Sequence, residues 1–382
     1  MYSVSAYGRM IADASRMDAY VSALRRAIKP GSVVVDLGSG PGLFALLACQ
    51  MGARRVYAIE PDDVIQVARE AAMVNGCLDR VEFIQDFSTN AKLPEQADVI
   101  VSDLRGILPL FQHHLPSIRD ARCRLLAPDG ILIPKRDTLW AAIAEVPNKY
   151  AEVVSPWEHN HQGVSLAAAR NLVTNTWSKA RVNSDDLLVQ PVCWHTIDYY
   201  KAEDADVRGE ISFSVTRAGI AHGLAVWFDS ELHDGIGFSN SPGSQELIYG
   251  NAFFPFPQPV EVAIDDQVSI RLRADLIKDD YVWRWDTRIH DQEKPESLKA
   301  DFKQSTLFGT PLSLMHLRKR ATTYVPIPND EGRLNSFILS RMDGKNSVEQ
   351  IATDVANQFP LRFREASDAL HVVAEISAKY SA

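Results

Sequence analysis

A glycine-rich turn between an apolar run and a helical segment constrains this chain more than any other feature. The run Val33–Leu37 ends in the turn Gly38-Ser-Gly-Pro-Gly42, and a second apolar run, Val56–Ile59, ends at Glu60. A buried strand that leads into such a turn brings backbone N–H groups to a ligand, and an acid after the next strand can bind two ribose hydroxyls. The order of these elements predicts a nucleoside-binding site in a doubly wound α/β domain.

The glycine spacing and one acid indicate which nucleoside binds. Gly38, Gly40 and Gly42 follow G-x-G-x-G rather than the G-x-G-x-x-G of dinucleotide-binding enzymes, and Asp36 stands two residues before the first glycine. A carboxylate there repels a pyrophosphate and attracts an ammonium group. A ligand with an amino acid at one end and adenosine at the other meets these demands, so we predict S-adenosylmethionine as the cofactor, bound by Asp36, the three glycines and Glu60.

The periodicity of the chain changes near Pro134. Before it, short β-branched runs alternate with helical segments, which indicates a parallel sheet with its ligand at the carboxyl ends of the strands. The expected strands there are Val33–Leu37, Arg55–Ile59, Val81–Ile84, Asp98–Val101 and Gly130–Ile133, and the expected helices are Leu43–Gln50, Val64–Asn75 and Pro116–Leu126. This arrangement places Asp86 and Phe87 beside the adenine and Ser102 beside the cofactor, although Asp86 and Phe87 are equally compatible with an ordinary loop.

After Pro134, seven short runs separated by turn residues indicate an antiparallel sandwich or barrel. They are Thr138–Val146, Leu187–Pro191, Gly209–Val215, Ala221–Phe228, Val260–Ile264, Gln267–Ala274 and Val282–Trp285. A segment at about 156–184 interrupts them, and Val164–Leu172 within it is expected to be helical. Three further helical stretches follow, Leu334–Met342, Ser347–Gln358 and Glu365–Tyr380. We therefore expect a Rossmann-like domain at 1–136, a β-barrel domain at 137–318 and a small helical domain at 319–382.

Composition limits the partners. A net charge of −9 over 382 residues gives no general attraction to nucleic acid. No apolar run reaches the ~20 residues of a membrane span, and the first residues lack the pattern of a signal peptide. The four cysteines form no metal-binding or disulfide pattern. We expect a cytoplasmic protein without a bound metal ion.

Residues 7–290 resemble the protein arginine methyltransferases, a family of S-adenosylmethionine-dependent enzymes. The helix-like segment Tyr7–Arg16 is similar to the family's first helix, in which an arginine matching Arg16 contacts the cofactor carboxylate. Ile133-Pro134 matches the hinge before the barrel, and the segment at 156–184 lies where the family carries a dimerisation arm. The resemblance implies a Rossmann-like methyltransferase domain, a β-barrel with a helical arm, a protein or peptide substrate and a homodimer.

The acceptor loop departs from the family's pattern. In the family, two glutamates of this loop clamp a guanidinium, whereas this chain has Asp103 at the first position and the neutral Gln112 at the second, with Arg105 between them. A guanidinium stays protonated in water, so two buried acids are needed to orient it. The family's Thr-His-Trp loop is replaced by Leu247–Tyr249, so an apolar side chain stands in place of the histidine.

We therefore predict a methyltransferase whose acceptor need not be arginine. Asp103 is expected to orient or deprotonate the acceptor, and Arg105 to anchor an anionic part of it. His113 and His114 could also accept a proton, although a solvated start of a helix explains them as well. The competing hypothesis is a catalytically silent relative that binds the cofactor and docks a partner peptide.

The C-terminal helical stretches carry a separate signal. Ser347 with Gln350 forms a capping box before an apolar helix face. The turn Asp343–Ser347 between two helices resembles that of the small PqqD-type peptide-binding domains, which have a winged-helix fold. This resemblance implies a peptide-binding role, and the alternative is a helical appendage that packs on the barrel.

Overall fold

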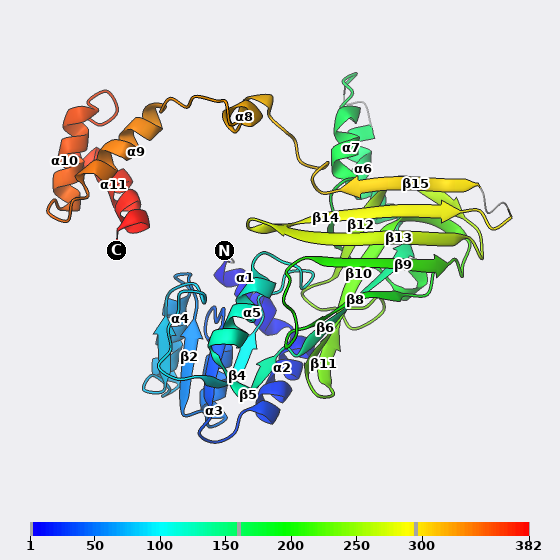
Figure 1. Cartoon of the computed structure of the whole chain (residues 1–382), viewed down its shortest axis with the longest axis horizontal. Helices are drawn as coiled ribbons and strands as arrows, with labels where there is room; N and C mark the ends of the chain where they lie inside the picture. The colour runs from blue at the N-terminus through cyan, green and yellow to red at the C-terminus, as the bar shows by residue number, and fades with distance from the viewer. Residues whose placement is uncertain (1–2, 159–161, 294–296, 382) are drawn as a thin grey trace. The chain divides into compact units, whose positions relative to one another are not determined.

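The computed structural model describes residues 3–158, 162–293 and 297–381. The chain divides into two compact units, Met1–Pro311 and Leu312–Ala382. The first unit contains a parallel sheet with helices and an antiparallel barrel, and the second contains helices (Figure 1). Among the described residues, no helix is long and apolar enough to cross a membrane.

The parallel sheet of the first unit has five strands. They are β1 (Val33–Leu37), β2 (Arg55–Ile59), β3 (Val81–Ile84), β4 (Ala97–Ser102) and β5 (Leu126–Ile133), in the spatial order β3-β2-β1-β4-β5. All four pairings are parallel, with Leu37 opposite both Ile59 and Ser102. The predicted parallel sheet is therefore confirmed. Its carboxyl edge brings Asp36, Glu60, Asp86 and Ser102 to one side of the domain.

Helices bury both faces of this sheet, as the alternation along β1 shows. Val33 and Val35 lie in one apolar cluster together with residues of α5 (His114–Arg124). Val34 lies in a second cluster with residues of α2 (Ala14–Ala27) and α3 (Leu43–Gln50). The remaining helices of this region are α1 (Val4–Ala12) and α4 (Ile65–Val74). The domain is thus doubly wound, as predicted.

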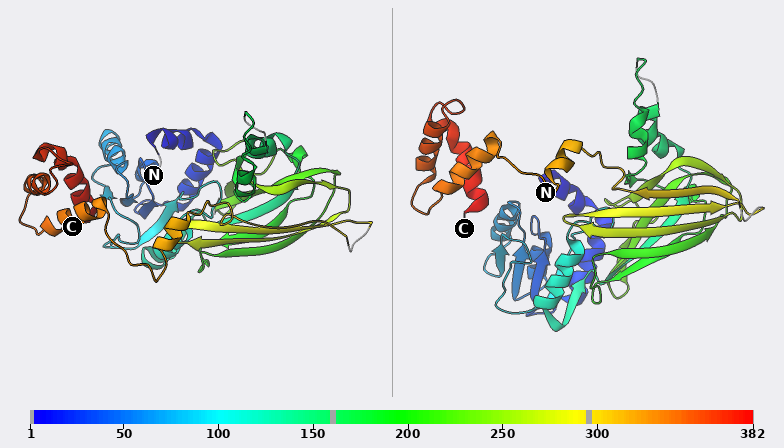
Figure 2. Two further views of the ribbon diagram at one scale, coloured as in Figure 1. Left: turned by 90° about the horizontal axis from the view of Figure 1, so that it is seen from above. Right: turned by 45° about the horizontal axis from the view of Figure 1, so that its top comes forward.

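The antiparallel part contains two sheets. The first has the order β7-β12-β10-β6-β8, with β11 paired to β10, and the second has the order β15-β14-β13-β9. Their bounds are β6 (Arg136–Ala144), β7 (Ser178–Ala180), β8 (Val192–Asp198), β9 (Val207–Ser214), β10 (Gly219–His233), β11 (Ile236–Ser239), β12 (Asn251–Val262), β13 (Gln267–Ile277), β14 (Asp280–His290) and β15 (Leu298–Ser305). Figure 2 shows the two sheets curving toward each other. Trp283 and Trp285 of β14 both lie in the core.

Some boundaries differ from the sequence prediction. Residues 187–191 form only isolated bridges, Leu187 to Ala144 and Val189 to Val215, and the regular strand is β8. The short or charged strands β7, β11 and β15 were not predicted. β15 has the sequence LKADFKQS, in which charged residues obscure the alternation of buried side chains. Pairing with β14 rather than intrinsic pattern makes it a strand.

The segment that interrupts the barrel contains α6 (Pro147–Glu158), a 3-10 turn at Ala167–Ala169 and α7 (Arg170–Val173). It projects beyond the barrel strands in Figures 1 and 2. The predicted helix at Val164–Leu172 is thus shorter and shifted toward its C-terminal end. Residues 159–161 of the predicted arm lie outside the described residues.

The second unit contains α8 (Leu314–Lys319), α9 (Asp330–Arg341), α10 (Val348–Gln358) and α11 (Ala366–Tyr380). The last three match the three predicted helices and share a small core that includes Ile338, Ile351 and Val373. Ser347 and Gln350 form the predicted capping box. The described residues of this unit contain helices and turns but no strand, and the resemblance to PqqD-type domains stays a prediction.

Candidate functional site

The glycine turn has the backbone shape that requires glycine. Gly38, Gly40 and Gly42 have φ angles of 71°, 51° and 82°, a region that other residues adopt at a steric cost. A Cβ on Gly38 would lie 2.2 Å from Leu104 Cδ2, and one on Gly40 would lie 2.6 Å from Tyr7 Cε1. The turn therefore lies directly against α1 and against the segment that follows β4.

Asp36 and Glu60 are both buried at this turn. The Asp36 Oδ2 atom accepts a hydrogen bond of 2.9 Å from the backbone N–H of Ala45 at the start of α3. Glu60 accepts from the N–H of Gly40 at 2.9 Å and from that of Asp62 at 3.0 Å. Burial raises the pKa of Asp36 to about 7 and also raises the pKa of Glu60, an effect that the two amides partly offset.

Several polar atoms around the turn have no hydrogen-bond partner within the described residues. They include Asp36 Oδ1, Ser39 Oγ and Ser102 Oγ, all buried. Buried polar atoms normally have partners, and those that lack one commonly face a ligand or an ordered water. One acceptor oxygen and two hydroxyls at the carboxyl edge of the sheet suit the amino-acid and ribose groups of S-adenosylmethionine. The residues present therefore fit the predicted cofactor.

Asp86 and Phe87 lie at the end of β3 on the same edge of the sheet. Asp86 Oδ1 accepts hydrogen bonds from the backbone N–H of Phe87 at 2.6 Å and from the Asn90 side chain at 2.9 Å. The Phe87 residue is 65% exposed. The pair thus forms a local turn with an exposed ring, and its contact with an adenine stays a prediction.

Arg16 reaches the acceptor loop from α2. Its Nε donates to Asp103 Oδ2 at 2.8 Å and to the Tyr249 hydroxyl at 3.1 Å, and its Nη2 also contacts Asp103. Nη1 donates to the carbonyl oxygen of Met10 at 3.0 Å. Asp13 begins α2 by accepting from the Arg16 backbone N–H at 3.2 Å. The arginine predicted for the cofactor carboxylate is thus held beside the predicted acceptor acid.

Asp103 is nearly enclosed, since its side chain is 5% exposed. Besides Arg16 it binds Arg105 Nε at 3.2 Å, and the Tyr249 hydroxyl lies 2.8–2.9 Å from its two oxygens. Burial by itself would raise the pKa of Asp103, but Arg16 and Arg105 outweigh burial and the pKa lies below its usual range. Asp103 is therefore ionised at neutral pH and fully engaged by its own chain.

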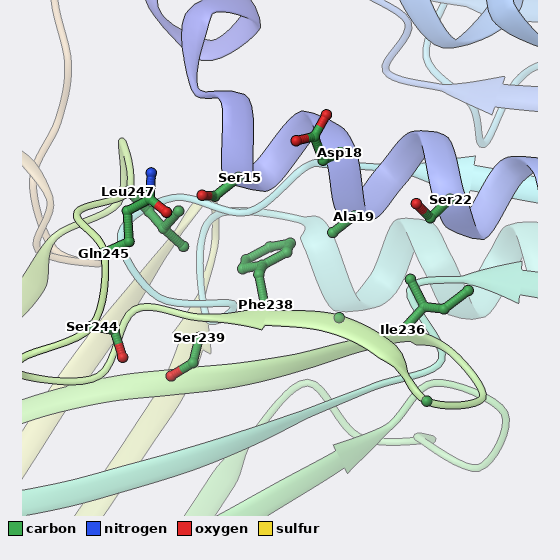
Figure 3. A pocket seen from close by; sticks show the side chains of 12 residues that line it. Ser15, Asp18, Ala19, Ser22, Ile236, Phe238, Ser239, Ser244, Gln245 and Leu247 are labelled. Carbon is green, nitrogen blue, oxygen red and sulfur yellow. The ribbon is translucent and has the colours of Figure 1, made fainter.

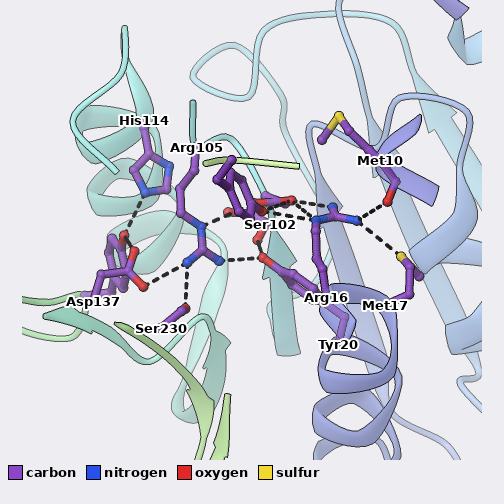
Figure 4. Close-up of polar contacts among 12 residues, drawn as sticks. Met10, Arg16, Met17, Tyr20, Ser102, Arg105, His114, Asp137 and Ser230 are labelled. Carbon is purple, nitrogen blue, oxygen red and sulfur yellow. Dashed lines mark hydrogen bonds and ion pairs between the residues drawn. The ribbon is translucent and has the colours of Figure 1, made fainter. Parts of the chain in front are cut away.

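Arg105 corrects the sequence prediction. Its side chain is fully buried, and it binds residues of α2 and of the barrel as well as Asp103 (Figure 4). Nη1 donates to Asp137 Oδ1 at 2.8 Å and to Ser230 Oγ at 2.6 Å, and Nη2 donates to the Tyr20 hydroxyl at 2.6 Å. A guanidinium with these partners is not available to anchor an anionic acceptor. The expected role of Arg105 as a substrate anchor is wrong for this structure.

Asp137 connects this network to α5. It accepts from the Tyr199 hydroxyl, which is also 2.8 Å from His114 Nε2. Burial raises the pKa of Asp137 despite Arg105, and burial together with Arg105 lowers the pKa of His114 to about 3. His114 is therefore neutral and structural, while His113 is exposed and lies 3.1 Å from Asp279. His114 is thus not exposed at the start of its helix.

Sequence reasoning missed five members of this network: Tyr20, Asp137, Tyr199, Ser230 and Tyr249. Tyr249 stands within the stretch that replaces the family's histidine loop, and its hydroxyl gives that stretch a polar contact with Asp103. The apolar replacement is Ile248, whose backbone N–H donates to Asp13 at 2.7 Å. A signal was present for Asp137, because it alternates with the apolar Leu139 and Ala141 on one face of its strand, and a charged residue on a buried face needs a partner.

Gln112, at the position of the family's second acid, is exposed and has a φ of 43° in the turn before α5.

An open pocket of about 620 Å³ lies between the other face of α2 and β11 (Figure 3). Ser15, Asp18 and Phe238 are among its lining residues, and Phe238 also packs on Arg105. No residue of the glycine turn lines it. Within the described ranges, no group of His, Cys, Asp or Glu has the arrangement of a metal site.

Two family models match the chain. "Arginine methyltransferase oligomerization subdomain" matches residues 135–288, and "Ribosomal protein L11 methyltransferase (PrmA)" matches residues 18–153. The probable protein arginine N-methyltransferase 6 of Arabidopsis thaliana is 30% identical over 238 residues, which are 60% of this chain and 54% of that protein. Protein arginine N-methyltransferase 6 of Xenopus tropicalis is 29% identical over 281 residues, 70% of this chain and 82% of that protein.

The sequence and the fold of this chain are similar to those of the protein arginine methyltransferases. The matched region spans about half the length of the Arabidopsis relative and about four fifths of the frog relative. Solved structures agree on the fold. Arabidopsis thaliana protein arginine methyltransferase 10 has a TM-score of 0.70 at 22% identity, over 79% of this chain and 97% of that chain. The Trypanosoma brucei PRMT1 enzyme–prozyme complex has a TM-score of 0.71 at 19% identity, over 78% of this chain and 96% of that chain.

These matches confirm the predicted family and the predicted order of a methyltransferase domain followed by a barrel. The two family models together span residues 18–288, which lie within the first unit. In this chain, Asp103 at the start of the predicted acceptor loop is bound by two arginines, Arg16 and Arg105.

Proposed function

We propose that this protein is an S-adenosylmethionine-dependent methyltransferase whose acceptor is a group other than the arginine guanidinium. The observation that carries the proposal is the glycine turn with Asp36 and Glu60 at one edge of a parallel sheet. The cofactor supplies an activated methyl group when bound. Asp36 and Glu60 would hold its ammonium and ribose groups, and the turn would present N–H groups to its amino-acid end.

The chain's own residues position the acceptor side. Arg16 and Tyr249 fix the orientation of the Asp103 carboxylate, and Leu104 packs over Gly38. A fixed, ionised and water-poor carboxylate can orient a nucleophile for in-line transfer, since positioning and exclusion of water supply much of the acceleration in such reactions. Its burial means that the acceptor loop must open for substrate to reach Asp103.

A protein or peptide acceptor is the class we propose, because the relatives are named as enzymes that act on proteins. Arginine is the unfavourable choice within this class. Asp103 is already neutralised by two arginines, and the second position of the loop is the exposed, neutral Gln112. Arg16 and Arg105 already balance the charges of Asp103 and Asp137, so a third guanidinium at Asp103 would find no unpaired carboxylate.

The test combines binding with transfer. Calorimetry should detect S-adenosylhomocysteine binding, and labelled S-adenosylmethionine should give little or no transfer to arginine-glycine-rich peptides or histones. Labelling of a cell extract then distinguishes an active methyltransferase from a catalytically silent scaffold. Incorporation into any extract protein supports an enzyme, whereas cofactor binding without incorporation supports the silent scaffold. Absence of binding at millimolar ligand refutes both, and efficient arginine methylation refutes the acceptor argument.

We further propose that two copies pair through the segment at about 156–184. Val164 is 59% exposed and Leu166 is 45% exposed there, while Leu172 is half-buried. Exposed apolar residues on a projecting segment commonly mark an interface. Light scattering should give twice the chain mass of 42.5 kDa. Replacing Val164 and Leu166 by serine should give a monomer, and Ile277→Ser, an exposed apolar residue of β13, serves as the control.

A cytoplasmic location and a peptide-binding role for the second unit also remain proposals. The first rests on composition, and the second rests on the turn between α9 and α10. Direct pull-down of a synthetic peptide by the full chain, with and without residues 330–381, tests the second.

A further inference from the structure

The guanidinium of Arg105 is buried, and each of its three nitrogen atoms donates at least one hydrogen bond. Four of its contacts are hydrogen bonds to different groups, two of them carboxylates on separate elements. Its Cζ atom also lies 5.5 Å from the ring centroid of Phe228 and 5.4 Å from that of Phe238. The site therefore consists of two acids, two hydroxyls and two aromatic faces: Asp103, Asp137, Ser230, Tyr20, Phe228 and Phe238.

Such a set selects a guanidinium over other cations. Two carboxylates on different nitrogens match the planar, multi-donor fork of a guanidinium, whereas an ammonium offers a compact point charge. Aromatic faces favour a flat, weakly hydrated cation. Asp103 comes from the loop after β4, while Asp137 and Ser230 come from β6 and β10, which are paired neighbours. The acids are thus fixed by the fold rather than by the arginine alone.

We infer that this chain contains a guanidinium-binding clamp formed by Asp103 and Asp137, and that its own Arg105 fills the clamp as a tethered occupant. Arg105 is then the residue that keeps free guanidinium groups out. The consequence for arginine acceptors rests on the proposed function. The clamp itself does not, because it can be tested without cofactor or methyl transfer.

Chemical rescue tests the clamp. The variant Arg105→Ala removes the side chain from Cγ outward, and ethylguanidinium is that missing fragment. The variant should melt roughly 6–15 °C below the wild type, since the buried Asp137 loses its arginine and Asp103 keeps only one of its two. Ethylguanidinium at about ten times its dissociation constant should raise the variant's melting temperature by about 2–4 °C. Ethylammonium and N-ethylurea, which lack either the fork or the charge, should not.

The matched control is Arg105→Ala combined with Asp137→Asn, which keeps the cavity and removes one acid. Rescue by ethylguanidinium should be lost in this double variant, and the wild type should not respond. If Arg105→Ala cannot be purified, Arg105→Lys replaces it, because the lysine keeps one charge without the fork and should be destabilised although it folds. Equal stabilisation by all three compounds, no response of Arg105→Ala, or a fully stable Arg105→Lys would each overturn the inference.

Discussion

Replacing Glu60 by glutamine tests the cofactor site with little change of shape. A carboxylate offers about four lone-pair positions for hydrogen bonds. In this structure two of them are used, one on each oxygen, by the N–H groups of Gly40 and Asp62. Two positions therefore remain for the two ribose hydroxyls, so the carboxylate can bind the cofactor without giving up its backbone contacts.

The magnitude follows from this accounting. Glutamine keeps one acceptor oxygen, so one backbone N–H and one ribose hydroxyl lose this acceptor, and the other two donors lose a charged one. A hydrogen bond to a charged group contributes about 1.5–3 kcal/mol and a neutral one about 0.5–1.5 kcal/mol. We expect S-adenosylhomocysteine affinity to fall by about 1–3 kcal/mol, or roughly 5–150-fold. The folded state should change less, because burial already raises the pKa of Glu60 and the neutral amide avoids that cost.

Isothermal calorimetry with S-adenosylhomocysteine measures the affinity, and urea unfolding measures the stability of the same samples. Glu95→Gln is the matched control, since Glu95 precedes β4, is bound to Arg54 at the surface and lies outside the turn. It should leave the affinity unchanged. Wild-type affinity in Glu60→Gln would refute the placement of the ribose at this acid.

Three further predictions concern stability. Burial lowers the pKa of His114 to about 3. Between that pH and about pH 6.5 the unfolded chain binds a proton at this residue and the folded chain does not. His114 therefore lowers the free energy of unfolding by about 2 kcal/mol at pH 5 relative to pH 7. Asp36, with a pKa raised to about 7, changes the free energy of unfolding with pH in the opposite direction over part of this range. The effect of His114 is therefore measured as the difference between the free energies of unfolding in urea of the wild type and of His114→Gln. That difference should shrink by about 2 kcal/mol on going from pH 7 to pH 5, and a constant difference would contradict a neutral buried histidine. Tyr249→Phe should cost about 1.5–3 kcal/mol because its hydroxyl binds an ionised carboxylate, against about 1 kcal/mol for Tyr281→Phe, whose hydroxyl donates to a backbone carbonyl; equal losses would argue against an ionised Asp103. Ser347→Ala should lower the stability of the second unit by about 1 kcal/mol through loss of its helix cap, measured as helical ellipticity during urea unfolding, and no change there would contradict the capping box.

Local sequence patterns were sufficient for much of the first unit. A strand, a glycine turn and a helix in direct succession interact over a few residues, so the turn at Gly38–Gly42 follows from the sequence around it. The alternation of apolar residues in β14 likewise predicts which face is buried, since the period of a strand is set by its own backbone. The capping box at Ser347 is equally local. The charged strand β15 lacked such a pattern and was missed, because its pairing partner determines it.

The acceptor side depended on contacts that no local pattern encodes. The position of Arg105 between Asp103 and Gln112 indicated a positive charge in the predicted acceptor loop, and the absence of the family's second acid there stays a prediction. The tertiary structure alone supplied the partners: Asp137 lies 32 residues away and Ser230 lies 125 residues away. A buried charge is stable only where the fold brings an opposite charge to it, and residues far apart in sequence carry no mutual signal. The sequence thus determined the glycine turn and its two acids, while the packing of barrel against sheet decided that Arg105 faces inward.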